Sequence, residues 1–116
     1  MSNNVVNIFA VHAINSTAIA EELVRIQAEL SASGALHSSG TVWEPTDEEP
    51  LRFISAWGPD VHLLELLLRR LAAVDAVVTV ENAYCEEFLE AVGVQLCRFK
   101  NGGIKFVIID GELSAD

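Results

Sequence analysis

The sequence predicts an α+β protein in which two helices cover one face of an antiparallel sheet. Its 116 residues are 51% hydrophobic and 21% charged, which is typical of one globular domain. Strand and helix patterns follow one another in the order strand, helix, strand, strand, helix, strand. Two further apolar runs flank Asn101-Gly102, the dipeptide most typical of a tight hairpin. These observations favour a ferredoxin-like βαββαβ sandwich followed by a C-terminal β-hairpin.

Hydrophobic periodicity indicates the first strand and the first helix. Residues 5–14 are apolar and β-branched, as in a central strand. Asn15, Ser16 and Thr17 are residue types that cap helices. The predicted helix then carries apolar side chains three and four residues apart: Ile19, Leu23, Ile26 and Leu30.

The next two strands are predicted as a hairpin around an acidic turn. Gly40 opens a short strand that ends at Trp43, and residues 44–50 form a turn between two prolines. Residues 51–57 then alternate in polarity as a strand does. We expect one face of this strand to carry Leu51, Phe53, Ser55 and Trp57.

The second helix is predicted from its cap and its wide apolar face. Gly58-Pro59-Asp60 ends the preceding strand and supplies the cap, and Glu65 and Arg69 form an i,i+4 pair. The apolar face consists of Val61, Leu64, Leu67, Leu68 and Leu71.

The remaining elements are a strand over 76–80, a short helix over 84–92 that ends at Gly93, and the hairpin strands 94–99 and 104–109. The chain is expected to be a single domain over 1–116. Within it, residues 5–80 form the βαββαβ core, residues 81–110 the short helix and C-terminal hairpin, and residues 111–116 a tail.

The charge of the chain limits its partners. Seventeen acidic residues against seven basic ones give a net charge of -10. This disfavours direct binding of nucleic acid or of an anionic membrane, because both need Lys and Arg against phosphate. No apolar run is long enough to span a membrane, and the N-terminus lacks the basic region of a signal peptide, so we expect a cytoplasmic protein.

Residue types that carry chemistry are present without the spacing that catalysis or metal binding needs. The three histidines, His12, His37 and His62, have no helical metal spacing. Cys85 and Cys97 form no CxxC pair, and Cys85 is followed by acidic residues rather than by a basic group that would activate a thiol. Phosphate-binding and nucleophile motifs are absent from the sequence. We therefore expect that the chain is not an enzyme and that it has no catalytic residues, no metal site and no cofactor.

Two acidic segments beside aromatic residues are candidates for a protein interface. Aromatic rings serve as anchors at interfaces, and carboxylates steer a basic partner. The alternative is that the aromatic residues fill the core and the acids keep the chain soluble. The candidate partner-binding residues are Trp43, Glu44, Asp47, Glu48, Glu49, Glu81, Tyr84, Glu86, Glu87 and Glu90.

About half of the chain resembles a known family. The run Leu51-Arg52-Phe53-Ile54-Ser55-Ala56-Trp57-Gly58-Pro59 is similar to the "TAWSPP" junction of YubB-type ferredoxin-like proteins of plasmids and phages. Residues 81–87 resemble the tyrosine-plus-acid strand end of that family, and Trp43-Glu44-Pro45 lies where the family has a Trp-containing hairpin. The resemblance implies the fold and an origin in a mobile genetic element, but no biochemical activity.

A small acidic protein of a phage or plasmid without catalytic residues suits inhibition by binding. We expect it to bind a host protein with a basic, nucleic-acid-binding surface, as anti-CRISPR and anti-restriction proteins do, steered by charge. One alternative is an immunity protein against a basic nuclease toxin. Another is a ferredoxin-like regulatory domain that binds a small molecule. An exposed sheet edge would allow a homodimer under each of these hypotheses.

Overall fold

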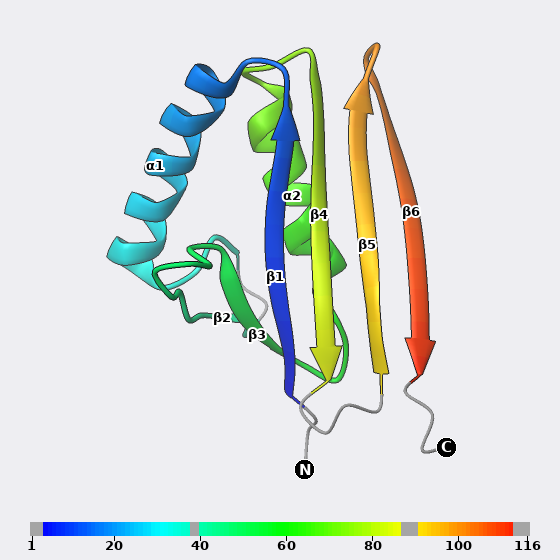
Figure 1. The fold of residues 1–116 in the computed structure, drawn as a ribbon. Coiled ribbons are helices and arrows are strands. Elements are labelled where there is room, and N and C mark those ends of the chain that lie inside the picture. Colours follow the sequence, from blue (N-terminus) through cyan, green and yellow to red (C-terminus); the bar gives the residue numbers. More distant parts are fainter. Residues whose placement is uncertain (1–3, 38–39, 87–90, 113–116) are drawn as a thin grey trace.

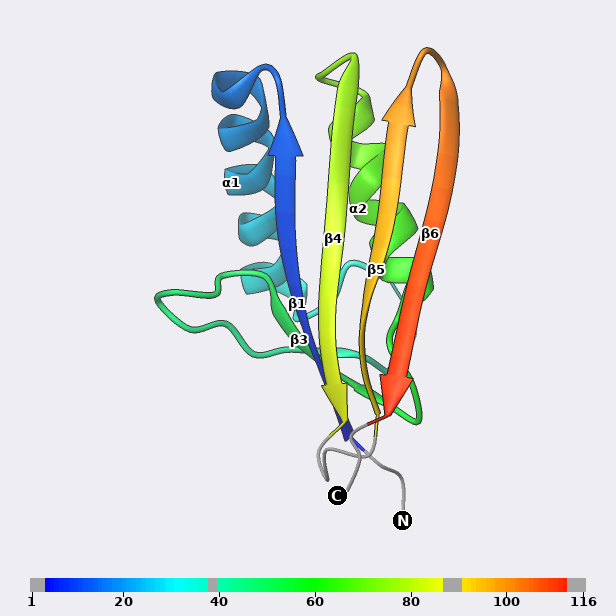
Figure 2. The ribbon, with the colours of Figure 1, turned by 45° about the vertical axis from the view of Figure 1, so that its right-hand side comes forward.

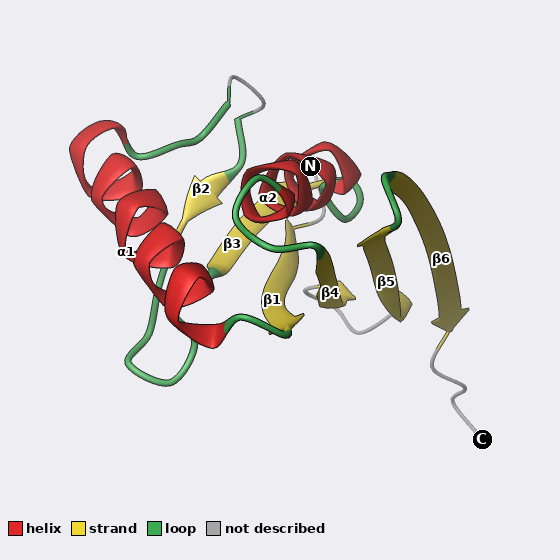
Figure 3. Cartoon of the chain, turned by 90° about the horizontal axis from the view of Figure 1, so that it is seen from above, coloured by secondary structure: helices red, strands yellow, loops and turns green. Residues whose placement is uncertain are grey.

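Six antiparallel strands form one sheet, and two helices lie against one of its faces (Figure 1, Figure 3). The computed structural model describes residues 4–37, 40–86 and 91–112. The strands lie in the order β2-β3-β1-β4-β5-β6. The elements are β1 (Asn4–Ala13), α1 (Ser16–Ser33), β2 (Val42–Trp43), β3 (Arg52–Ala56), α2 (Val61–Ala72), β4 (Val77–Glu86), β5 (Ala91–Lys100) and β6 (Gly103–Glu112).

The predicted α+β class, with an antiparallel sheet and two helices on one face, is confirmed. The strand order and count differ from a simple ferredoxin-like sandwich with a separate hairpin. The strands β5 and β6 continue the same sheet beyond β4 (Figure 1). They join this sheet because β4 is long enough to pair with β5 from Val77↔Lys100 to Cys85↔Val92.

The short helix predicted over 84–92 is wrong for the residues that the structure describes. Residues 84–86 belong to β4, and residues 91–92 belong to β5; residues 87–90 lie outside the described part. The strand predicted to end at residue 80 continues to Glu86. Asn82 occupies a core-facing position and is fully buried, but its polar side chain interrupts the alternation of apolar and polar residues that identifies a strand.

Both helices begin at the predicted caps. Asn15 Oδ1 accepts a hydrogen bond from the Ala18 N–H at 3.1 Å, and Asp60 Oδ1 accepts one from the Leu63 N–H at 2.9 Å. Helix α1 ends at Gly34, whose positive φ of 79° suits glycine and whose N–H donates to the Leu30 carbonyl. These local signals set where the helices begin and where α1 ends. Helix α2 then covers β4 and β5, on the same face of the sheet as α1 (Figure 3).

The core lies between the helices and the sheet. The rings of Phe9 and Phe53 meet edge to face, with centroids 5.6 Å apart, on the neighbouring strands β1 and β3. Leucines of α2 and the sheet residues beneath them complete the cluster, together with Ile19, Ile26 and Leu30 of α1. Its fully buried members include Ile26, Leu63, Leu64, Leu67, Leu68, Leu71, Val78, Val80 and Cys97.

The opposite face of the sheet carries the side chains that alternate with the core-facing ones. No described helix lies against it, and we call it the open face (Figure 3). Its cross-strand neighbours include Glu81 of β4 beside Leu96 of β5, which in turn lies beside Val107 of β6. Part of this face is therefore apolar, and Val107 remains 51% exposed.

Ion pairs join the two helices at the edge of the core. Arg70 of α2 donates to Glu22 Oε1 at 2.8 Å and to Glu29 Oε1 at 3.1 Å, both on α1. Arg25 reaches the second Glu22 oxygen at 2.9 Å. Burial would raise the pKa of the Glu22 carboxyl, but the hydrogen bonds and charges of Arg70 and Arg25 outweigh it, so that the pKa is lowered.

The lowered pKa predicts how stability depends on pH. A carboxyl whose pKa is lower in the folded state stabilises the fold above its unfolded pKa, near 4.5. That stabilisation is lost as the pH falls through the folded pKa. We expect Glu22→Gln to lower the free energy of unfolding by about 1–2 kcal/mol at pH 7, and the difference from wild type to shrink below pH 4.

Urea unfolding at several pH values measures this difference. The control is Glu65→Gln, since Glu65 pairs with Arg69 at 2.9 Å on the exposed face of α2. Such an i,i+4 pair contributes only about 0.3–0.5 kcal/mol. A Glu22→Gln variant whose loss of stability did not change with pH would contradict the lowered pKa of Glu22.

Candidate functional site

The acidic loop between β2 and β3 projects away from the sheet (Figure 2). We use the name acidic loop for residues 44–50. Its tip is a defined turn, because the backbones of Thr46 and Glu49 hydrogen-bond each other at 3.1 and 3.2 Å. The Thr46 hydroxyl also accepts from the Glu49 N–H at 3.0 Å. The exposed carboxylates of Asp47 and Glu48 are therefore carried on a structured turn.

The base of the acidic loop is held by two side chains. Trp43 Nε1 donates to the Pro50 carbonyl at 2.8 Å, while the Trp43 ring packs half-buried against the core. Arg52 donates to the Glu44 carbonyl at 3.2 Å and lies 3.4 Å from its carboxylate. Trp43 thus anchors the loop to the core, and the charge of Glu44 is partly neutralised. Asp47, Glu48 and Glu49 have no ion-pair partner among the described residues.

The second predicted acidic segment does not join this surface. Glu81 lies on the open face with its carboxylate 3.4 Å from His12. Tyr84, only 7% exposed, faces the helices, and Glu86 is half-buried on the same side of β4. Strand β1 separates β4 from β3, so these side chains lie away from the acidic loop. Glu87 and Glu90 lie outside the described residues.

Trp57, which the alternating pattern placed on the same face as the buried Phe53 and Ser55, is 73% exposed. Its φ of 73° is the left-handed conformation, which reverses the chain at the end of β3 and turns the ring out of the alternation. A non-glycine residue in this conformation costs about 1–2 kcal/mol. The Gly58-Pro59 that follows Trp57 is the sequence signal for a turn at this position.

A hollow of about 370 Å³ lies beside Trp57 at the start of α2. Asp60, at 8% exposure, accepts a hydrogen bond from the Thr41 hydroxyl at 2.6 Å and lies 3.1 Å from His37 Nε2. The α2 cap thereby also fixes the segment that leads into β2. The hollow is lined by Gly40, Thr41, Ser55, Ala56, Trp57, Gly58, Pro59, Asp60, Val61 and His62.

A buried polar network holds this turn from below. The fully buried Asn7 amide donates to Ser55 Oγ at 2.8 Å, and Asn7 Oδ1 accepts from the Asp60 N–H at 3.2 Å. The Ser55 hydroxyl donates in turn to the Gly58 carbonyl at 2.7 Å. Because these groups are buried away from water, breaking one of these hydrogen bonds would leave a polar group unsatisfied at a large desolvation cost. The bonds therefore fix the conformation of the turn.

The same network continues across the sheet. Asn82 Nδ2 donates to Asn7 Oδ1 at 2.9 Å and to Gln95 Oε1 at 3.3 Å. The Oδ1 atom of Asn82 is buried without a hydrogen-bond partner in the described part of the chain. Polar side chains of β1, β3, β4 and β5 are therefore linked beneath the start of α2.

The remaining candidates for chemistry lie apart. Within residues 4–37, 40–86 and 91–112, no group of three His, Cys, Asp or Glu side chains could hold a metal ion. Burial raises the pKa of the Cys97 thiol to about 11, so that it stays protonated in the core. Cys97 belongs to the hydrophobic core between the helices and the sheet.

The conformation of Trp57 gives a prediction for stability. Glycine adopts positive φ without strain, whereas alanine retains the left-handed penalty. We expect Trp57→Gly to be more stable than Trp57→Ala by about 1 kcal/mol, since neither variant removes a buried ring.

Chemical unfolding of the two variants measures this difference. The control pair is Val24→Gly and Val24→Ala at an exposed position of α1. There glycine should instead be less stable than alanine, by about 1 kcal/mol. The same order of stability at both positions would contradict the left-handed assignment of Trp57.

Comparison with protein-family models, curated proteins and solved structures gives no match to this chain. None of the described helices is long and apolar enough to cross a bilayer.

Proposed function

We propose that the chain acts in the bacterial cytoplasm as a stoichiometric inhibitor of a host nucleic-acid-handling defence complex, of the anti-CRISPR or anti-restriction class. Its surface would bind the Lys and Arg residues that the target uses against phosphate. The observation that carries the proposal is the acidic loop, a structured projection with exposed carboxylates. The net charge of -10 would add long-range steering.

The rigidity of the acidic loop supports binding rather than solubility alone. A loop that is already ordered loses little conformational entropy when a partner binds. The bonds between Thr46 and Glu49, and between Trp43 and Pro50, provide that order. Solubility would need the same charges but no fixed arrangement of them.

Trp57 supplies an apolar anchor within reach of the same partner. Exposed tryptophans dominate the binding energy of many interfaces. Trp57 and the acidic loop flank opposite ends of β3, a strand of five residues, which places them roughly 17 Å apart. One standard interface, with about 800 Å² on each partner, can include both.

Two other functions remain alternatives. An immunity protein against a basic nuclease toxin would use the same surface, and the identity of the partner distinguishes it. A small-molecule-binding regulatory domain is favoured by the hollow beside Trp57, whose polar lining includes Thr41, Asp60 and His62. That function predicts a ligand-dependent shift of the melting temperature, and a homodimer in solution.

We also propose a fold family for the core of the molecule. We propose that β1 to β4 and both helices form a ferredoxin-like core, related to the YubB-type proteins of plasmids and phages. Its support is the arrangement of β1 between β3 and β4, with both helices on one face. The strands β5 and β6 would be an extension of that core.

A pull-down with a charge-matched control tests the function. The loop variant carries Asp47→Asn, Glu48→Gln and Glu49→Gln. The control variant gains the same charge on the exposed side of α1 through Ala20→Lys, Val24→Lys and Ala28→Lys. Tagged proteins are incubated with a nuclease-treated lysate of bacteria that have active CRISPR and restriction systems.

We expect the wild type and the control to retain one nucleic-acid-binding complex in stoichiometric amount, and high salt to release it. The loop variant should bind at least tenfold more weakly, with an unchanged melting temperature. Equal loss in both variants would mean that only net charge matters. Equal retention by the loop variant would exclude the acidic loop as the binding surface.

A further inference from the structure

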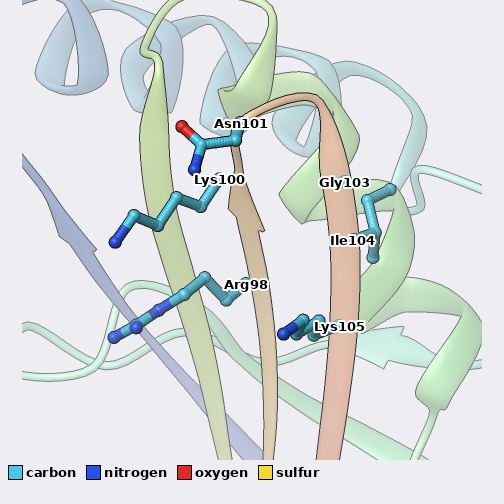
Figure 4. Close-up of a pocket in the computed structure, with 6 residues that line it drawn as sticks. All are labelled: Arg98, Lys100, Asn101, Gly103, Ile104 and Lys105. Carbon is cyan, nitrogen blue, oxygen red and sulfur yellow. The ribbon is translucent and has the colours of Figure 1, made fainter.

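Three of the seven basic residues converge on one hollow at the turn of the β5–β6 hairpin. Arg98 and Lys100 belong to β5 and Lys105 to β6, and Figure 4 shows all three extending to the same side of the hairpin. We call this site the basic hollow; its volume is about 490 Å³. The lining residues are Arg98, Lys100, Asn101, Gly103, Ile104 and Lys105.

These three cations differ from the other basic residues of the chain. In the described part of the molecule, no carboxylate pairs with Arg98, Lys100 or Lys105. The nearest acid along the open face, Glu81, lies against His12 instead. By contrast, a glutamate oxygen lies within 3.4 Å of each of the remaining four: Arg25, Arg52, Arg69 and Arg70.

The strand register brings the positive charges together. Arg98 lies directly opposite Lys105 across the β5–β6 pair, and Lys100 follows two residues along on the same face. Like charges directly opposite each other destabilise a sheet. Acidic residues are abundant elsewhere in the sequence, so this repulsion is not a consequence of composition. A bound anion would offset it.

The arginine is already oriented toward such an anion. Arg98 Nε donates to the Thr79 hydroxyl of the neighbouring strand at 2.9 Å. That bond fixes the guanidinium on the open face and leaves its terminal nitrogens available for a bidentate contact. Asn101, in the turn with a φ of 53°, adds a side-chain amide to the lining.

We propose that the basic hollow binds a small ligand through two linked phosphate groups, either inorganic diphosphate or the diphosphate of a nucleotide. A single phosphate ester carries a charge of about -1.5 to -2 near pH 7. Two linked phosphates therefore match three cations better than one does. The volume of the hollow lies within the range of about 300–1,000 Å³ that is usual for small-molecule sites.

The charge of the whole chain favours a small ligand over nucleic acid. Three cations are fewer than the roughly 6–10 phosphate contacts of a typical DNA-binding protein. A long polyanion would also extend past the hollow. Its outer phosphates would lie farther from the three cations than the screening length of about 8 Å, and they would be repelled by a protein with a net charge of -10. A diphosphate stays within reach of the three cations.

Isothermal titration calorimetry and thermal unfolding with inorganic diphosphate test the proposal, using the full chain at low ionic strength. The variants are Arg98→Gln and Lys105→Gln. The matched control is Arg69→Gln, which removes the same charge from an exposed position of α2. We expect wild type and control to bind diphosphate equally and to gain several degrees in melting temperature at saturation.

Lys105→Gln and Arg98→Gln should bind at least tenfold more weakly. Without ligand, Lys105→Gln should melt no lower than wild type, because the like-charge pair is removed. ADP bound as tightly as diphosphate shows that the phosphates alone are recognised, whereas tighter ADP binding identifies a nucleotide as the source.

Failure of wild type to bind diphosphate or ADP would overturn the proposal. So would equal binding by wild type and Lys105→Gln, or orthophosphate bound as tightly as diphosphate. The acidic-loop variant should retain diphosphate binding, since it leaves the basic hollow intact. Failure of the inhibitor function and failure of this site are therefore distinguishable.

Discussion

The side-chain amide of Asn7 is the interaction on which the arrangement of the molecule depends. It lies fully buried in the centre of the sheet and contacts Ser55 of β3, Asp60 at the start of α2 and Asn82 of β4. A buried amide without partners would cost several kcal/mol, of the order of 2–7, so the elements that satisfy it must be in place together. The network therefore selects one position for the turn that presents Trp57.

Local signals in the sequence were sufficient for much of the fold. Asn15 and Asp60 cap helices through bonds to residues three positions away, and Asn101-Gly102 closes a hairpin with both φ angles positive. Such contacts depend on neighbours in the chain and can be read from it. The length of β4 could not be read in this way. Asn82 is a polar residue at a core position, and its partner Asn7 lies 75 residues away.

The candidate site was predictable to a similar extent. Asp47 and Glu48 are exposed on a turn bounded by prolines, which composition alone indicates. The burial of Tyr84 depends on which face of β4 meets the helices, and that follows from register rather than from the residues nearby. The basic hollow also depends on register, because Arg98 and Lys105 become neighbours only when the hairpin closes. Net charge gave no indication of it.

Hydrogen exchange of the Asp60 backbone amide, whose N–H donates to Asn7 Oδ1, tests most directly whether the Asn7 network holds the turn. Exchange is compared between wild type and Asn7→Ala, with amides of the β4–β5 ladder as the internal reference. We predict that the substitution speeds exchange at Asp60 at least tenfold more than in the ladder, because the turn opens locally. An Asp60 amide that lost no more protection than the ladder would contradict the account.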